Sequence, residues 1–310
     1  SSPTTTTRRA GVAGMRREPA LDTAGTFHPA GLREWSKWDA PAMLPGVVAA
    51  ALKEGAGRVL TVPMVIDGGL AGVLTVAREG EATFSPAERE TVTQLATQAA
   101  VALSNAALVA RLDRMNRGAL NALARTVDAK STWTAGHSER VTNLAVDLGR
   151  VLGLDERALE TLRRGGLLHD IGKIGVPAAI LDKPGKLTAE ETRLMRQHPD
   201  LGAHILAPIP EYADVIPIVL EHHERFDGRG YPRGLQGTEI SFGARIFAVA
   251  DVYDALTSQR PYRAPLTPGQ ATAVIRDNRG THFDPQVADA FVEMIEPRLA
   301  APDAAEPMAC

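Results

Sequence analysis

Residues 164–175 read RGGLLHDIGKIG, and the rest of the chain is best understood from this stretch outward. An apolar Leu pair predicts a helix that ends at His169 and Asp170, with Lys173 one helical turn later. Neutral imidazoles and carboxylates together suit divalent first-row metals. An adjacent His-Asp pair can place one ligand on each of two ions if the carboxylate bridges them. By itself such a pair is more often a cap or a surface pair, so the hypothesis of a two-metal hydrolase site depends on the remaining sequence.

Further ligand-type residues stand along the chain. The candidate metal ligands are His137, His169, Asp170, His198, His222, His223 and Asp251. His137 is expected at the start of one helix, and the pair His222 and His223 at the end of another. Asp251 lies in the apolar stretch ARIFAVADVYDAL, residues 244–256, where a lone carboxylate is costly unless it is paired or bound to a metal. This position is the strongest local indication of a metal site.

The composition bounds the class of protein. The chain has 310 residues, enough for two domains, and 44% of them are hydrophobic and 23% charged, as in soluble globular proteins. The formal net charge of -3 argues against a nucleic-acid polymer as partner, since that usually needs a strongly basic face. The single cysteine, Cys310, excludes a disulfide framework and a thiolate metal cage, so a reducing cytoplasm is the expected location.

The sequence predicts no membrane-spanning segment and no ordered structure at either end of the chain. The richest apolar run, Ala99–Ala110, is interrupted by Ser104 and Asn105, so no run reaches the roughly 18 residues of a membrane span. We therefore expect no membrane contact. Residues 1–26 are expected to form a disordered leader and residues 299–310 a flexible tail.

A β-hairpin is predicted in the first third of the chain. Two β-rich runs, VLTVPMVI at residues 59–66 and GVLTVA at residues 72–77, are separated by an Asp-Gly-Gly turn. Upstream, Trp35 and Trp38 stand three residues apart, a spacing interpreted as two ring anchors on one helix face.

A long helix should follow the hairpin. Ser85 is the expected N-cap, with Pro86 at the first helical position and Glu88 completing a capping box. A heptad-like seam of apolar and small residues then runs through Val92, Leu95, Ala99, Ala102, Ala106, Val109, Leu112, Met115, Ala119 and Leu123. Such a seam fits either one amphipathic helix packed on its own domain or a connecting helix that pairs in a homodimer. We expect the homodimer.

The first part of the chain resembles the C-terminal half of a GAF sensory domain. The resemblance rests on VPM at residues 62–64, LAGVLTVAR at 70–78, FSPAERE at 84–90 and LATQAAVALSNAAL at 95–108. The first strands and helix of that family are not recognisable. The resemblance implies a partial GAF-like sensory or dimerisation domain over residues 27–110, followed by a connecting helix over residues 111–128.

From Leu120 to Pro297 the sequence is mostly helical in pattern and shows no strand alternation of useful length. Loops are indicated by Lys183-Pro184-Gly185 and by the Gly-rich segment 227–232. The predicted fold class is therefore α+β overall, with a small α/β module joined by a long helix to an all-α domain.

The helical part resembles the HD-GYP family, the HD phosphohydrolases that hydrolyse the bacterial second messenger cyclic di-GMP. The matching motifs are HDIGK at residues 169–173, QHP at 197–199, HHERFDGRGYP at 222–232, ADVYDALTSQRPYR at 250–263 and GTHFDP at 280–285. They occur in the order typical of the family. The resemblance implies an HD-GYP domain over residues 119–298.

The resemblance also implies roles for individual residues. The seven candidate ligands would hold two divalent ions, iron or manganese, with Asp170 as the bridging carboxylate. Asp170 and Lys173 are the implied catalytic residues. Some members of the family carry a Glu four residues before the first ligand and hold a third ion, but Trp133 occupies that position here. We therefore expect two ions.

Substrate contacts are implied in the same way. The implied contacts are Lys173, Gly230, Tyr231, Pro232, Arg260 and Arg263. Lys173 would bind a phosphate, and the two arginines would hold the guanine-phosphate framework. The Gly-Tyr-Pro loop would shape the substrate mouth and provide a docking place for protein partners.

The expected function is hydrolysis of cyclic di-GMP to pGpG, with GMP as a further product, by a hydroxide that two metal ions activate near neutral pH. Two alternatives stay open. One is a cyclic di-GMP-binding or protein-interaction module with little turnover. The other is a hydrolase of another cyclic dinucleotide, whereas the Gly-Tyr-Pro loop and the RPYR segment make a deoxynucleotide triphosphate a weaker candidate.

Overall fold

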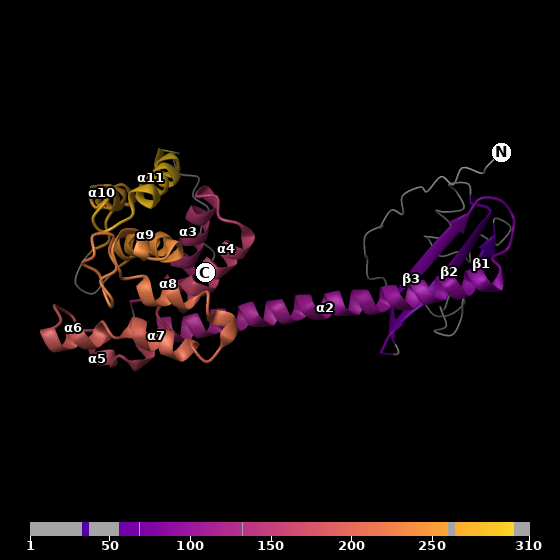
Figure 1. Cartoon of the computed structure of the whole chain (residues 1–310), viewed down its shortest axis with the longest axis horizontal. Helices are drawn as coiled ribbons and strands as arrows, with labels where there is room; N and C mark the ends of the chain where they lie inside the picture. Colours follow the sequence, from indigo (N-terminus) through magenta and orange to yellow (C-terminus); the bar gives the residue numbers. More distant parts are fainter. Residues whose placement is uncertain (1–32, 37–55, 68, 132, 260–263, 301–310) are drawn as a thin grey trace. The chain divides into compact units, whose positions relative to one another are not determined.

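The computed structural model describes residues 33–36, 56–67, 69–131, 133–259 and 264–300. The chain divides into two compact units, Ser1–Asp113 and Arg114–Cys310 (Figure 1). Strands are confined to the first unit and the second is helical, so the predicted α+β class is confirmed for the described residues.

The first unit contains a three-stranded antiparallel sheet in the order β1-β2-β3. The strands are β1 (Arg33–Ser36), β2 (Arg58–Ile66) and β3 (Gly69–Arg78). The predicted hairpin is confirmed, because β2 and β3 pair directly on either side of the turn. The predicted helix around Trp35 is wrong: residues 33–36 form a strand paired with β2, and Trp38 lies outside the described residues. Aromatic residues also favour strands, so a three-residue spacing of two rings was weak support for a helix.

Helix α2 (Pro86–Asp128) begins where the capping box predicts it. The Ser85 backbone N–H donates to Glu88 Oε2 at 2.7 Å, and the Glu88 N–H donates to Ser85 Oγ at 3.3 Å. In its first turns Val92 and Ala96 pack against buried residues of the sheet, such as Leu60. The beginning of the helix therefore belongs to the core of the first unit.

Among the described helices, α2 is the one long and apolar enough to cross a membrane by length and composition, and 11% of its most apolar window is buried. Helices that cross a membrane and helices that pack against another helix share these properties. The expectation of no membrane contact rested on the lack of an uninterrupted apolar run, and it stays a prediction.

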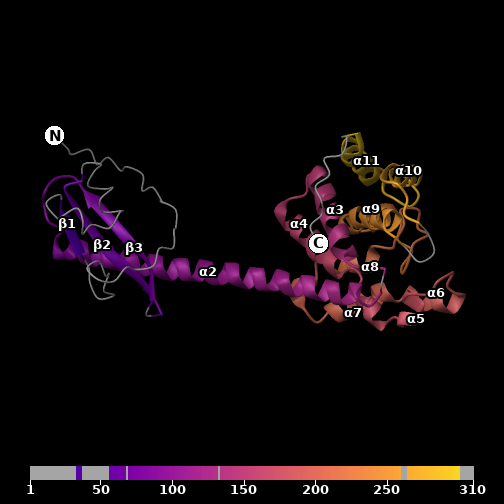
Figure 2. The same ribbon diagram turned by 180° about the vertical axis from the view of Figure 1, so that it is seen from behind.

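The second unit is built from short helices, as predicted. They are α3 (His137–Val151), α4 (Glu156–Leu168), η2 (Ile171–Gly175), α5 (Ala178–Leu181), α6 (Ala189–Met195), α7 (His198–Leu206), η3 (Pro210–Tyr212), α8 (Ile216–Glu221), η4 (Gly237–Glu239), α9 (Phe242–Thr257), α10 (Pro268–Asp277) and α11 (Pro285–Ala300). Both views show α8 lying between α7 and α9, with α10 and α11 beyond α9 (Figures 1 and 2). The described residues of this unit hold two isolated β-bridges and no strand.

Helix α9 forms the centre of the larger core. Ile246, Phe247 and Val249 are fully buried and pack against α3, α4 and α11. A helix that is apolar on nearly all sides is stable only when surrounded by protein. Charged side chains on such a helix therefore need specific partners, and Asp251 has one in His137, whose Nε2 lies 3.2 Å from Asp251 Oδ1.

A second core cluster joins the end of α2 to the HDIGK stretch. Leu120 and Ala124 pack against Leu167, Leu168 and Val219. Burial of such side chains contributes about 1.5–3 kcal/mol each for the larger ones. The last turns of α2 are thus part of the framework around His169 and Asp170.

Candidate metal centre

All seven predicted ligands meet in one place, although they come from five helices. His137 is the first residue of α3, the His169-Asp170 pair follows α4, and His198 is the first residue of α7. His222 and His223 follow α8, and Asp251 lies within α9. The predicted positions of His137 at the start of one helix and of His222 and His223 at the end of another are confirmed. Most of them are buried, with His169 and His198 each 1% exposed.

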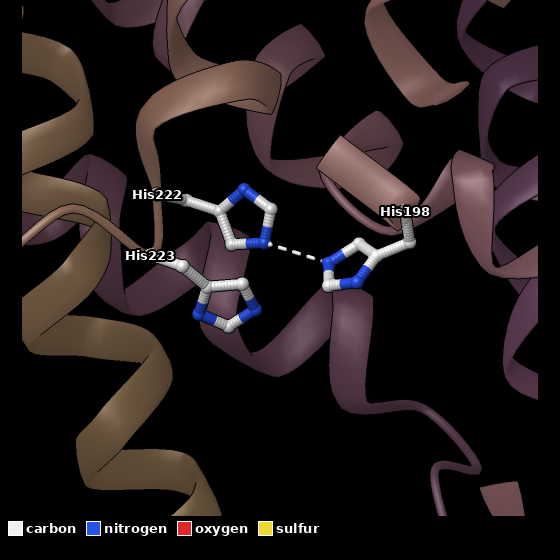
Figure 3. Close-up of side chains that lie close together, drawn as sticks. All are labelled: His198, His222 and His223. Carbon is white, nitrogen blue, oxygen red and sulfur yellow. Dashed lines mark hydrogen bonds between the residues drawn. The ribbon is translucent and has the colours of Figure 1, made fainter. Parts of the chain in front are cut away.

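The ligands form two groups. In each group the potential ligand atoms lie within 4.8 Å of one another: His137, His169 and Asp170 in the first, and His198, His222 and His223 in the second. Figure 3 shows the rings of His222 and His223 facing the ring of His198. Asp170 lies between the groups, with Oδ2 3.1 Å from His169 Nε2 and Oδ1 3.4 Å from His198 Nε2.

Three of the histidines are oriented by the same kind of hydrogen bond. The Nδ1 atoms of His169, His198 and His222 each donate to the carbonyl three residues earlier, at distances of 2.7–2.8 Å. A carbonyl oxygen only accepts, so the proton lies on Nδ1, and in the neutral ring the lone pair lies on Nε2. Metal-bound histidines commonly have such a partner on the second nitrogen, which fixes the tautomer and the ring. All three rings therefore present Nε2 as the ligand atom.

This arrangement leaves acceptors facing one another in the protein interior. His198 Nε2 and His222 Nε2 lie 3.3 Å apart, the contact drawn as a dashed line in Figure 3. Burial lowers the pKa of His198 to about 4 and also holds the pKa of His222 well below its usual value, so both rings are neutral near pH 7 and neither Nε2 has a proton to donate. Asp170 Oδ1 is also buried without a hydrogen-bond partner among the described residues. Buried acceptors of this kind are costly unless satisfied, and divalent cations satisfy all of them.

The first ligand group differs from the second because the ring of its His137 is protonated on both nitrogens. His137 Nδ1 lies 2.7 Å from Asp254 Oδ2, and its Nε2 lies 3.2 Å from Asp251 Oδ1. Burial lowers the pKa of His137, but the bonds to the two carboxylates outweigh it and raise the pKa to about 9. Burial raises the pKa of Asp251, but the bond to His137 and the interactions with the surrounding histidines together lower it. His137 is therefore an imidazolium held between two carboxylates.

Asp254 is a partner that the sequence analysis missed. It lies one turn after Asp251 on α9 and is also bound by Arg140, whose Nε is 2.7 Å from Asp254 Oδ1. By bonding Nδ1 of His137, Asp254 directs the other ring nitrogen toward Asp251. The spacing of two carboxylates at i and i+3 in ADVYD was the available indication.

The two predicted catalytic residues are in contact. Lys173 Nζ donates to Asp170 Oδ2 at 2.5 Å. Burial raises the pKa of the Asp170 carboxyl, but its interactions with His169, Lys173 and His198 together outweigh burial, so the pKa lies well below its usual value. Asp170 is therefore an anionic, acceptor-only group between the two ligand groups, with one ammonium at its edge.

The Gly-Tyr-Pro loop is held directly against the second group. The Tyr231 ring stacks on the His223 ring with centroids 4.8 Å apart, and the Tyr231 N–H donates to the His223 carbonyl at 3.2 Å. A Cβ at Gly230 would lie 2.4 Å from Glu224 Cα, so only glycine allows this approach. The buried Glu224 carboxylate accepts hydrogen bonds from the backbone N–H groups of residues 233, 234 and 235. These bonds hold the chain where it leaves the loop.

A cavity of about 460 Å³ opens beside His223. Its lining residues are Arg196, His223, Arg225, Arg229, Gly230, Tyr231 and His282. Arg225 is bound to Asp227, whereas no carboxylate of the described residues lies within 4 Å of Arg196 or Arg229. Arg196 also lies 5.0 Å from the centroid of the Tyr231 ring. The wall next to His223 is therefore rich in guanidinium groups.

Arg196 was missed from the sequence, although a basic residue two positions before a candidate ligand was the available indication. The structure cannot place Arg260 and Arg263, because residues 260–263 lie outside the described part of the chain. The other implied substrate contacts, Lys173 and the Gly-Tyr-Pro loop, lie at the ligand groups.

The HD domain family model matches residues 121–287, which is more than half of the chain, so the chain belongs to the HD domain family. Members of this family are metal-dependent phosphohydrolases, in agreement with the ligand groups described above. A GAF domain model matches residues 30–104. Both resemblances found in the sequence are confirmed.

Curated relatives match the helical unit. The chain is 44% identical over 167 residues to 3'3'-cGAMP-specific phosphodiesterase 3 of Vibrio cholerae, which covers 54% of this chain and 36% of that protein. It is 40% identical over 183 residues to the cyclic di-GMP phosphodiesterase response regulator RpfG of Xanthomonas campestris, a match that covers 58% of this chain and 48% of that protein. It is 46% identical over 178 residues to cyclic di-GMP phosphodiesterase PA4108 of Pseudomonas aeruginosa, a match that covers 56% of this chain and 43% of that protein. The chain thus spans less than half the length of each of these relatives.

Metal binding should be measurable as stabilisation. Adding Mn²⁺ at about 100 times its dissociation constant should stabilise the wild-type protein by about 2.7 kcal/mol, because the ion binds the folded state alone. His198→Ala should lose most of this gain, since it removes one ligand of the second group. The measurement is thermal unfolding with and without Mn²⁺.

His204→Ala is the matched control, because His204 is an exposed histidine on the same helix. It should keep the full Mn²⁺ effect. An equal gain in all three proteins would indicate nonspecific binding, and no gain in the wild type would contradict the metal centre.

Proposed function

We propose that this protein is a metal-dependent phosphodiesterase that hydrolyses cyclic di-GMP to pGpG, with GMP as a further product. The single observation that carries the proposal is the convergence of seven ligand-type side chains, with Asp170 between two buried groups. The HD domain match and the names of the curated relatives support the same reaction.

The proposed site holds two divalent cations, one at each ligand group. Iron or manganese suits a set that is rich in imidazole, contains carboxylates and lacks thiolates. Trp133 offers no oxygen where a third ion would need one, so two ions are proposed. When bound, such a pair of cations offsets the charge that develops on a phosphodiester and lowers the pKa of a nucleophilic water.

The remaining chemistry belongs to the residues of the chain. Asp170 keeps its negative charge and orients the site between the two groups. Lys173 lies at the edge of Asp170, where its ammonium is placed to bind a phosphate oxygen. Arg196 and Arg229 add guanidinium groups on the cavity wall for the rest of the phosphate framework. Tyr231 offers an aromatic surface beside His223, and Arg260 and Arg263 stay proposed contacts.

A mixed cyclic dinucleotide is the second candidate substrate. The observation in its favour is the 44% identity to a relative named as specific for 3'3'-cGAMP. The binding-module alternative is less favoured, because none of the seven ligand positions has been replaced by a residue unable to bind a metal.

Product analysis tests the proposed reaction. Protein loaded with Fe²⁺ or Mn²⁺ without oxygen should convert cyclic di-GMP to pGpG, and 3'3'-cGAMP should be tested in parallel. Asp170→Asn should reduce kcat by more than about 100-fold, because it removes the charge shared by both groups. Asp200→Asn, an exposed aspartate of α7, should keep wild-type turnover. Binding of cyclic di-GMP without any product would replace the proposal with the binding-module alternative.

The role of the guanidinium wall is tested separately. Arg196→Ala should raise KM for cyclic di-GMP about tenfold or more with little change in kcat, because a charged hydrogen bond to the substrate is lost in ground and transition states alike. Arg193→Ala removes an exposed arginine of the preceding turn that is paired with Glu190, and it should leave KM unchanged. Equal KM values for both variants would contradict a substrate contact at Arg196.

The domain organisation is also part of the proposal. A GAF-like sensory or dimerisation domain over residues 27–110, a connecting helix over 111–128 and an HD-GYP domain over 119–298 agree with family matches at 30–104 and 121–287. A cytoplasmic location and a protein-docking role for the Gly-Tyr-Pro loop are proposed with it.

A homodimer through α2 is proposed from the exposed apolar side chains of that helix. Leu95, Val109 and Leu112 of the predicted seam are 52%, 66% and 55% exposed. Pairing with a second copy would cover them. The predicted seam needs one correction: Val92 is buried against its own sheet and does not face a partner.

Light scattering tests the dimer. The double variant Val109→Lys and Leu112→Lys should shift the protein from dimer to monomer, because it places charges in the apolar seam. Ala107→Lys, which adds a charge on the opposite side of the helix, should leave the mass unchanged. A wild-type monomer at micromolar concentration would contradict the proposal.

A further inference from the structure

The segment that ends α2 touches the metal centre at two points that the reaction itself does not use. Asp128 is the last residue of α2, and Lys130 follows two residues later. Both belong to the second unit, where Leu120 and Ala124 of the same helix are anchored in the core. Their side chains bond to the turn after Asp170 and to the helix that begins at His137.

Lys130 binds the backbone of the turn that follows Asp170. Its Nζ donates to the carbonyl of Lys173 at 2.9 Å and to that of Ile174 at 2.5 Å. These carbonyls lie in the last turn of η2, where the Lys173 carbonyl also accepts the Val176 N–H. A cation is favoured at this end of a helix. Lys130 thus fixes the backbone of the short helix that starts directly after Asp170.

Asp128 caps the helix that begins at His137. The N-cap residue of α3 is Gly136, which has no side chain to accept from the first N–H groups. Asp128 supplies the missing acceptor from another helix: its Oδ2 accepts the Ser138 N–H at 3.2 Å, and its Oδ1 accepts the Ser138 Oγ–H at 2.7 Å. A carboxylate at a helix N-terminus is stabilising, and Asp128 is buried. The residue it holds is adjacent to His137.

Both contacts therefore act on residues of the first ligand group, of which Asp170 also faces His198 of the second group. In the described part of the chain, no hydrogen bond links the side chain of Asp128 or Lys130 to His198, His222 or His223. We propose that Asp128 and Lys130 are positioning residues that hold His137 and the Asp170 turn in the geometry that binds the first metal ion. The inference rests on the proposed two-metal site.

Metal stoichiometry gives a readout that general destabilisation would not reproduce. Isothermal titration of the full chain with Mn²⁺ should show two ions bound to the wild type. Lys130→Met should weaken the ion at the first group about 10–100-fold and the other ion less, because loss of an outer contact to a ligand typically has an effect of this size and Asp170 also faces the second group. Asp128→Asn should weaken the same ion. Lys130→Arg, which keeps donors and charge, should restore much of the binding.

Arg125→Met is the matched control. Arg125 lies in the last turn of α2 and pairs with Glu139 of α3, but its side chain is 70% exposed and it bonds neither the Asp170 turn nor Ser138. It should bind both ions as the wild type does. Thermal unfolding of the metal-free proteins should give equal midpoints for Arg125→Met and Lys130→Arg.

The outcomes separate this inference from the proposed function. Wild-type binding of two ions with unchanged binding in Lys130→Met and Asp128→Asn would overturn the positioning role alone. Equal weakening of both ions would also overturn it, because the effect would then be on the whole fold. Fewer than two ions on the wild type would overturn the proposed function and this inference with it.

Discussion

The second unit depends on one electrostatic constraint: buried ligand atoms that face one another without protons between them. The Nε2 atoms of His198 and His222 lie 3.3 Å apart, and Asp170 Oδ1 has no hydrogen-bond partner among the described residues. Removing such groups from water is unfavourable unless a cation satisfies them. The fold tolerates this unfavourable arrangement because the helices that carry the ligand residues hold them in place.

Backbone geometry makes the convergence possible. Three ligand rings are fixed by a bond from Nδ1 to the carbonyl three residues earlier, so the helix ends themselves set the tautomers. Close approach of the helices needs glycine at two places. A Cβ at Gly172 would lie 1.9 Å from the His198 carbonyl oxygen, and one at Gly166 would lie 2.5 Å from Thr142 Oγ1. The ligand groups are therefore tied to the packing of the unit.

The two groups are not equivalent. His198, His222 and His223 are neutral because burial lowers each pKa, whereas His137 holds a proton between Asp251 and Asp254. The first group also receives the contacts from the end of α2. An ion at the first group would displace the proton that His137 holds, whereas the neutral rings of the second group would offer their lone pairs directly. The chemistry of the site is thus asymmetric before any substrate binds.

The sequence by itself determined the helical class of the second unit, the hairpin, the capping box at Ser85 and the identity of all seven candidate ligands. These features depend on local periodicity, turn chemistry and motifs of adjacent residues such as HDIGK. Only the tertiary structure decided which nitrogen each histidine presents and how the ligands divide into two groups. It also decided that Trp35 lies on a strand, that Asp254 holds His137, and that Asp128 and Lys130 reach the first group. The physical reason is distance along the chain: Asp254 meets His137 across 117 residues and Lys130 meets Lys173 across 43, and no local pattern encodes such contacts.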